Sequence, residues 1–107
     1  MFDHPTVRQL AAELHQAERT RVQVRQFSQR FPDIQFEDSY RIQREWVRVK
    51  LAEGRKCIGR KIGLTSRAMQ LASQITEPDY GTLLDDMLLR DGAEVEASRF
   101  ILPRFET

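Results

Sequence analysis

Apolar residues near the N-terminus recur at helical spacing, and this pattern restricts the possible folds more than any other feature. Between Pro5 and about Arg19 they form one stripe, made of Val7, Leu10, Ala11, Leu14 and Ala17. Residues spaced in this way share one side of an α-helix, and that side must pack against another element. Pro5 suits a first helical turn, and Asp3 or His4 stands where a capping residue is expected. We therefore predict a packed helix from about Pro5 to Arg19.

A second helix is predicted from about Glu37 to Glu53. Glu37 and Asp38 place negative charge at its start, which the helix dipole favours. Gly54 follows as a C-terminal stop, because glycine readily takes the left-handed conformation that ends many helices. Trp46 lies on the same side as other large residues of this stretch, and we interpret it as a core residue.

The stretch from Cys57 to Leu64 has the pattern of a strand, but it contains two glycines. Gly59 and Gly63 weaken a strand, so they indicate a bulge or the close approach of another backbone. Cys57 is the only cysteine, which excludes an internal disulfide and fits a reducing compartment. A single cysteine in a strand is usually a small buried apolar residue, and we expect Cys57 to be buried.

Shorter elements are expected after this strand. Thr65 and Ser66 suit the start of a short helix through Ala72. Residues 75–81 have the composition of a loop, and residues 99–106 are predicted to form a strand that enters a core. Helices followed by short strands predict an α+β fold, with N-terminal helices packed on a small mixed set of strands. We divide the chain into a helical region, 1–56, and the start of a mixed α/β region, 57–107.

Composition and charge limit the function classes. Hydrophobic residues make up 40% and charged residues 31%, as in ordinary soluble domains. No stretch approaches the roughly 20 apolar residues of a membrane helix, and no leader is visible, so we expect a cytoplasmic protein without a membrane partner. Basic residues outnumber acidic ones between Arg19 and Lys61. No nucleic-acid-binding motif accompanies them, so a solvated helical face is favoured over a nucleic-acid partner.

Two segments carry a resemblance to a known family. Residues 59–70 read GRKIGLTSRAMQ, and residues 77–87 read EPDYGTLLDDM. Together with residues 40–47 and 100–106, they resemble the 2-keto-4-pentenoate hydratase group of the fumarylacetoacetate hydrolase superfamily. The resemblance implies a metal-dependent lyase of aromatic-compound catabolism, as in the homoprotocatechuate pathway. Its substrate would be a 2-hydroxydienoate or a 2-oxo-enoate such as 2-oxohept-4-ene-1,7-dioate, to which it would add water.

The same resemblance implies the site residues. Lys61 and Asp79 match catalytic positions, and Glu106 matches the first ligand of Mg²⁺ or Mn²⁺. Such hard ions prefer carboxylate oxygens, and residues two apart on a strand share a face and can hold one ion. In the family the partner ligands and a larger β-rich region follow Glu106. We therefore expect this chain to be a truncated front part, inactive by itself and without a tightly bound metal, of an enzyme that forms homo-oligomers.

Two alternatives stay open at this point. The chain could be a non-catalytic interaction module, or a partial subunit completed by another polypeptide. Within the family, 4-oxalocrotonate decarboxylase shares much of the same pattern.

Overall fold

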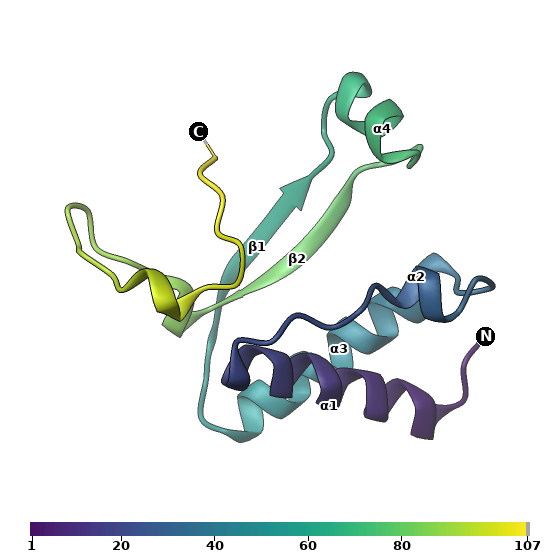
Figure 1. The fold of residues 1–107 in the computed structure, drawn as a ribbon, viewed down its shortest axis with the longest axis horizontal. Coiled ribbons are helices and arrows are strands. Elements are labelled where there is room, and N and C mark those ends of the chain that lie inside the picture. The colour runs from purple at the N-terminus through teal and green to yellow at the C-terminus, as the bar shows by residue number, and fades with distance from the viewer. Residues whose placement is uncertain (107) are drawn as a thin grey trace. The chain divides into compact units, whose positions relative to one another are not determined.

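The computed structural model describes residues 1–106, which form two compact units. The helical unit comprises Met1–Val49 together with the segment from Arg90 onward, and the hairpin unit comprises Lys50–Leu89. Helices and one antiparallel pair of strands confirm the α+β class (Figure 1). The elements in chain order are α1 (His4–Thr20), α2 (Phe27–Arg30), α3 (Phe36–Ala52), β1 (Cys57–Gly63), α4 (Arg67–Ser73), β2 (Asp79–Leu84) and the 3-10 turns η1 (Asp85–Met87) and η2 (Ala97–Arg99).

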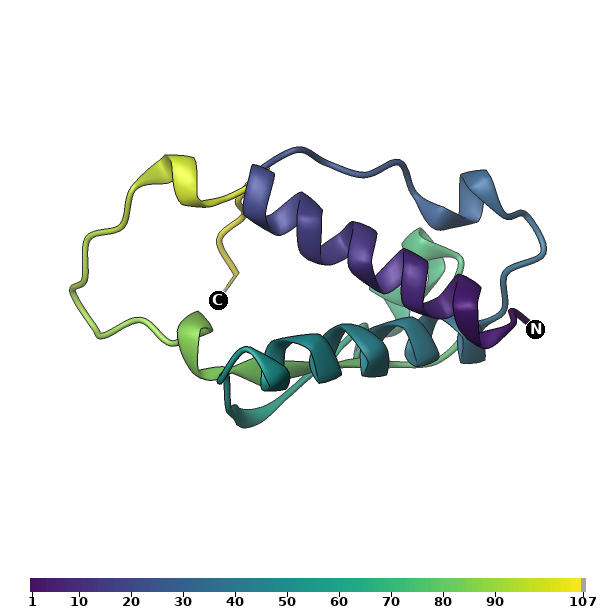
Figure 2. The same ribbon diagram turned by 90° about the horizontal axis from the view of Figure 1, so that it is seen from below.

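The core of the helical unit lies between α1 and α3, which run side by side (Figure 2). The predicted stripe of α1 supplies three buried side chains, and α3 supplies Ile42. Partly buried residues pack around them, including Trp46, as predicted. Burying one leucine or isoleucine side chain stabilises a fold by roughly 1.5–3 kcal/mol, so this cluster is the main source of stability in the unit. The buried set is Val7, Leu10, Ala11 and Ile42.

Both long helices have the ends that their sequences predict. The side chain of Asp3 accepts a hydrogen bond from the backbone N–H of Thr6 at 2.9 Å, which caps α1. Gly54 has a φ of 94° after the end of α3. The N–H of Arg55 donates to the carbonyl of Lys50 at 3.1 Å, and the N–H of Gly54 donates to the carbonyl of Leu51 at 3.0 Å. These two bonds close the helix in a Schellman motif.

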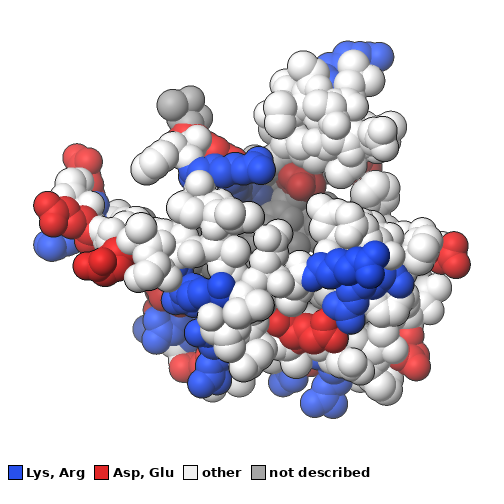
Figure 3. All heavy atoms as spheres, viewed as in Figure 1, with Lys and Arg blue, Asp and Glu red and all other residues white. Residues whose placement is uncertain are grey.

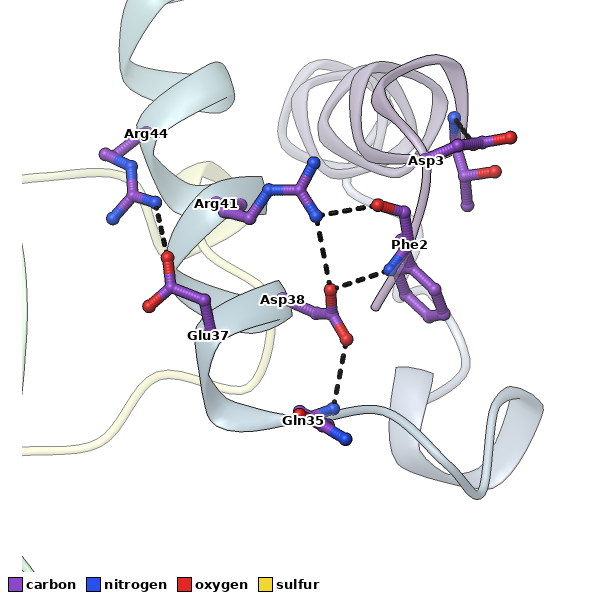
Figure 4. A network of polar contacts seen from close by, with 8 residues as sticks. Phe2, Asp3, Gln35, Glu37, Asp38, Arg41 and Arg44 are labelled. Carbon is purple, nitrogen blue, oxygen red and sulfur yellow. Dashed lines mark hydrogen bonds and ion pairs between the residues drawn. The ribbon is translucent and has the colours of Figure 1, made fainter.

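The Asp38 carboxylate binds the N-terminal segment to the start of α3 (Figure 4). Asp38 is only 1% exposed and accepts hydrogen bonds from the backbone N–H groups of Phe2, at 2.9 Å, and Gln35, at 3.2 Å. Arg41 donates to the carbonyl of Phe2 at 2.7 Å and lies 3.4 Å from the same carboxylate. These contacts favour the charged form, so they lower the pKa of Asp38, the hydrogen bond from Phe2 most of all.

The hairpin unit consists of β1 and β2, joined through α4. The strands pair antiparallel, with a register irregularity between Cys57 and Gly59. A bulge was one of the two expectations for the glycines of this strand, and at Gly59 it is confirmed. β2 begins at Asp79, so the predicted loop over 75–81 is wrong in its last part. Pairing with β1 holds residues 79–81 in an extended conformation, although their sequence alone looks like a turn.

The strand predicted over residues 99–106 is also wrong. η2 ends at Arg99, and the following residues to 106 are bends and irregular backbone. A strand requires a partner for its backbone hydrogen bonds. Within residues 1–106 the sheet contains β1 and β2 alone, so the apolar run from Phe100 to Phe105 has no ladder to join.

Charged side chains of both signs are mixed on the visible surface (Figure 3). Several arginines of the basic stretch contact acids of the helical unit. Arg30 binds Glu13 at 2.6 Å, and Arg48 binds Glu45 at 2.7 Å. None of the helices within residues 1–106 combines the length and the apolar run needed to cross a bilayer.

Candidate active site on the β hairpin

Antiparallel pairing brings Lys61 and Asp79 to the same face of the hairpin. Lys61 pairs with Gly81, and Gly63 pairs with Asp79. Side chains alternate between the faces of a strand, and directly paired residues share a face. Lys61 and Asp79 are therefore diagonal neighbours, a relationship that typically separates two residues by about 7–8 Å. Both are exposed, so an ammonium and a carboxylate are presented together on one accessible surface.

The carboxylate of Asp79 lies directly against Gly63. A Cβ atom built on Gly63 would overlap Oδ1 of Asp79, at a separation shorter than real Cβ atoms show from their neighbours. The sequence indicated close approach of another backbone at this glycine, but the structure places a side chain there. Gly63 is thus a residue of the candidate site that the sequence marked only as an unusual position in a strand.

A short turn links β1 to α4 beside this pair. Leu64 takes the left-handed conformation, with a φ of 53°, which is uncommon for a bulky residue. Its carbonyl accepts a hydrogen bond from Gln70 Nε2 at 2.8 Å. Ser66 caps α4 by accepting from the N–H of Met69 at 3.2 Å, as predicted for this residue. The turn is held from both sides, which fixes the end of the strand that carries Lys61.

Glu106 belongs to the helical unit, whereas Lys61 and Asp79 belong to the hairpin unit. It lies in irregular backbone and is exposed. Within residues 1–106, no three Asp, Glu, His or Cys side chains gather in a group suited to a metal ion. The donor set of this part of the chain therefore does not make a complete site for Mg²⁺ or Mn²⁺, and Glu106 would supply one carboxylate at most.

The expectation that Cys57 is buried is wrong, because this residue is exposed. β1 pairs with one strand and is largely open to solvent, although Leu84, the partner of Cys57 in β2, is buried. Arg60 Nη1 lies 2.6 Å from Cys57 Sγ. No sequence pattern predicts this contact between two side chains of β1 that are three residues apart.

The helical unit contains an apolar hollow of about 350 Å³, lined by residues of α1, α3 and the segments around them. None of the three candidate residues lines it. The lining residues are Leu14, Ala17, Glu18, Gln23, Val24, Trp46 and Ile101.

No protein-family model matches the chain. Individual relatives do match it. The 2-oxo-hept-4-ene-1,7-dioate hydratase of Escherichia coli is 57% identical over 106 residues, which is 99% of this chain and 40% of that protein. The 4-oxalocrotonate decarboxylase of Pseudomonas sp. (strain CF600) is 41% identical over 76 residues, which is 71% of this chain and 29% of that protein.

A solved structure has the same fold over most of the chain. It is the 4-oxalocrotonate decarboxylase from Pseudomonas putida G7 complexed with magnesium and adipate, with a TM-score of 0.77 and 34% sequence identity. The match covers 80% of this chain and 33% of that one. The same enzyme complexed with calcium and acetate matches equally well.

These matches define the class as that of the hydratases and decarboxylases of aromatic-compound catabolism. The chain belongs to the 2-keto-4-pentenoate hydratase group, and it spans less than half the length of the curated relatives it matches.

Proposed function

We propose that this chain forms part of a hydro-lyase that adds water to a 2-oxo-enoate, such as 2-oxohept-4-ene-1,7-dioate. The observation that carries the proposal is the shared face of Lys61 and Asp79, in the segment whose sequence matches the hydratase group. An ammonium and a carboxylate at this spacing are suited to binding an anionic substrate and moving protons on it. The strong identity to the E. coli hydratase supports the substrate class.

The chemistry has two stages. A 2-oxo-4-enoate loses a proton from C3 to give its 2-hydroxy-2,4-dienoate, which then becomes a conjugated 2-oxo-3-enoate as the enol proton leaves oxygen and a proton joins C5. Water then adds its hydroxyl to C4 and a proton to C3, which gives a 4-hydroxy-2-oxo acid. We assign to Lys61 the binding of the substrate carboxylate or a share in proton transfer, and to Asp79 the role of proton-transfer partner.

A divalent cation is part of this proposal. The matched decarboxylase structures are complexed with magnesium or with calcium, which supports Mg²⁺ or Mn²⁺ in the complete protein. When bound, such an ion polarises the oxygens of a 2-oxo acid. We propose Glu106 as one ligand. Because residues 1–106 contain no complete ligand set, we assign no step to the metal. We also propose a homo-oligomer, which the exposed Ile62, Met69 and Leu71 support.

Substitution in a chimera tests the roles of Lys61 and Asp79. This chain would replace the matching 40% of the E. coli hydratase, and loss of dienoate absorbance would be followed with added Mg²⁺. We expect Lys61→Met and Asp79→Asn to lower kcat/KM by about 100-fold or more, the usual contribution of a positioned acid or base. Arg60→Met and Asp86→Asn serve as charge-matched controls. Unchanged turnover in an active chimera carrying Lys61→Met or Asp79→Asn would contradict the assignment.

A decarboxylase is the second candidate, because the matched solved structures are decarboxylases. It predicts release of CO₂ from 4-oxalocrotonate in place of hydration of a dienoate. Assaying the chimera with both substrates, with and without Mg²⁺ or Mn²⁺, separates the two reactions.

A further inference from the structure

Three glycines occur on the face of the hairpin that carries Lys61 and Asp79. Gly59 and Gly63 are in β1, and Gly81 is in β2 opposite Lys61. None of the three has a positive φ, so an alanine could adopt the same backbone at each position. Conformational freedom therefore does not account for glycine here. The remaining difference between glycine and alanine is the space that a Cβ atom occupies.

That space differs greatly among the three positions. At Gly59 a Cβ would meet Leu83 Cδ1 at 4.0 Å, an ordinary contact. At Gly81 it would meet nothing within 4 Å among the described residues. At Gly63 it would overlap Oδ1 of Asp79 and lie 3.5 Å from Cγ. Only at Gly63 is the space of the missing side chain already occupied, and it is occupied by a candidate catalytic group.

We infer that Gly63 is a positioning residue. Because it has no side chain, the Asp79 carboxylate can lie against it, on the face of the hairpin that carries Lys61. A methyl group at position 63 forces the carboxylate to turn about χ1 or χ2, or forces the strands apart. Aspartate has only these two torsions, so its carboxylate cannot move aside as the end of a long side chain can. The inference rests on the proposed role of Asp79, and its first test measures the carboxylate without requiring turnover.

The test compares Gly63→Ala with Gly81→Ala and Gly59→Ala in the full 107-residue chain by NMR. The readouts are the three-bond N–Cγ coupling of Asp79, its carboxyl chemical shift and the pH titration of that carboxyl signal. Cross-strand contacts between β1 and β2 report whether the hairpin is intact. We expect Gly63→Ala to shift the Asp79 signals while the hairpin persists, and we expect both controls to leave them as in the wild type.

Two results would overturn the inference. One is an Asp79 whose coupling, shift and titration are unchanged in a folded Gly63→Ala chain. The other is an equal displacement of the Asp79 signals in Gly81→Ala. If Gly63→Ala unfolds the hairpin, the double variant Gly63→Ala/Asp79→Ala decides the matter. Removing the carboxylate should restore the cross-strand contacts, and a hairpin that stays unfolded would place the cause elsewhere and refute the inference.

Discussion

The helical unit and the hairpin unit differ in how completely their apolar side chains are buried. In the helical unit, the facing apolar residues of α1 and α3 are buried together, and Asp38 meets backbone donors and Arg41. In the hairpin unit Leu84 is buried, but Ile62, Met69 and Leu71 are each more than half exposed. The proposed catalytic pair lies in the second unit. Residues suited to chemistry thus occur where local packing is least complete, which is the usual relationship between a site and the scaffold that carries it.

Truncation of a core side chain should produce the largest effect and should act first on the helical unit. Leu10 is 1% exposed between α1 and α3. We expect Leu10→Ala to reduce the free energy of unfolding by about 2–5 kcal/mol, because it removes buried surface and leaves a cavity. Fluorescence of Trp46, which packs on this core, would follow unfolding in urea. Leu71→Ala is the control, since Leu71 is 70% exposed; an equal loss there would refute the contrast between the units.

The Asp38 carboxylate, which binds the N-terminal segment to the start of α3, should make the helical unit sensitive to acid. The pKa of Asp38 is lowered in the folded protein, chiefly by the hydrogen bond from Phe2, against about 3.9 in an unfolded chain. The folded state therefore binds a proton at Asp38 less tightly than the unfolded chain does. Its stabilisation is fully present above the unfolded pKa and is lost as the pH falls through the folded pKa.

Melting temperatures of the wild type and Asp38→Asn, measured from neutral pH down to pH 3, test this dependence. We expect the variant to be less stable at neutral pH and the difference to shrink as the pH falls. Asp91→Asn controls for the loss of one exposed negative charge. A difference that stays constant over the whole range would show that Asp38 acts without its charge.

Helices α1 and α3 could be predicted closely from the sequence, because their signals are local. The stripe of α1 and the capping residues Asp3 and Gly54 each act within a few residues of their own position. The predicted bounds of α1 and α3 are accordingly within two residues of those observed. The start of α4 at Ser66 was found by the same kind of signal.

The hairpin unit could not be predicted as well, because its geometry depends on pairing between distant residues. The resemblance to the family identified Lys61 and Asp79, but only the register shows that they share a face. β2 starts inside a predicted loop, and Cys57 is exposed where burial was expected. The failed strand over residues 99–106 lies in the helical unit but has the same cause, since an apolar run does not specify its own partner.

α3 and α4 are followed by different residues with positive φ angles. Gln74 follows α4 with a φ of 58°, and Gly54 follows α3 with a φ of 94°. A non-glycine residue is strained there, so we expect Gln74→Gly to stabilise the hairpin unit by about 1 kcal/mol. Gly54→Gln should cost a similar amount at the other helix end. Amide hydrogen exchange in α4 and α3 measures each effect locally. Faster exchange in α4 of Gln74→Gly would contradict the expected gain.

The smallest effect is expected at the turn that follows Lys61. Gln70→Ala removes the hydrogen bond from Gln70 Nε2 to the carbonyl of Leu64, worth about 1 kcal/mol. Alanine is a better helix former than glutamine, which offsets part of that loss, so the net cost should be about 0.5 kcal/mol. Arg67→Ala, at an exposed position of the same helix, controls for the propensity change alone.

Hydrogen exchange of the turn amides should separate these two contributions. We expect faster exchange at Leu64 and Thr65 in Gln70→Ala and no change there in Arg67→Ala. The left-handed Leu64 would then depend on a single side chain for its anchorage, whereas α1 and α3 are held by many contacts at once. Equal protection of the turn in both variants would mean that the backbone alone holds this conformation and that Gln70 does not anchor it.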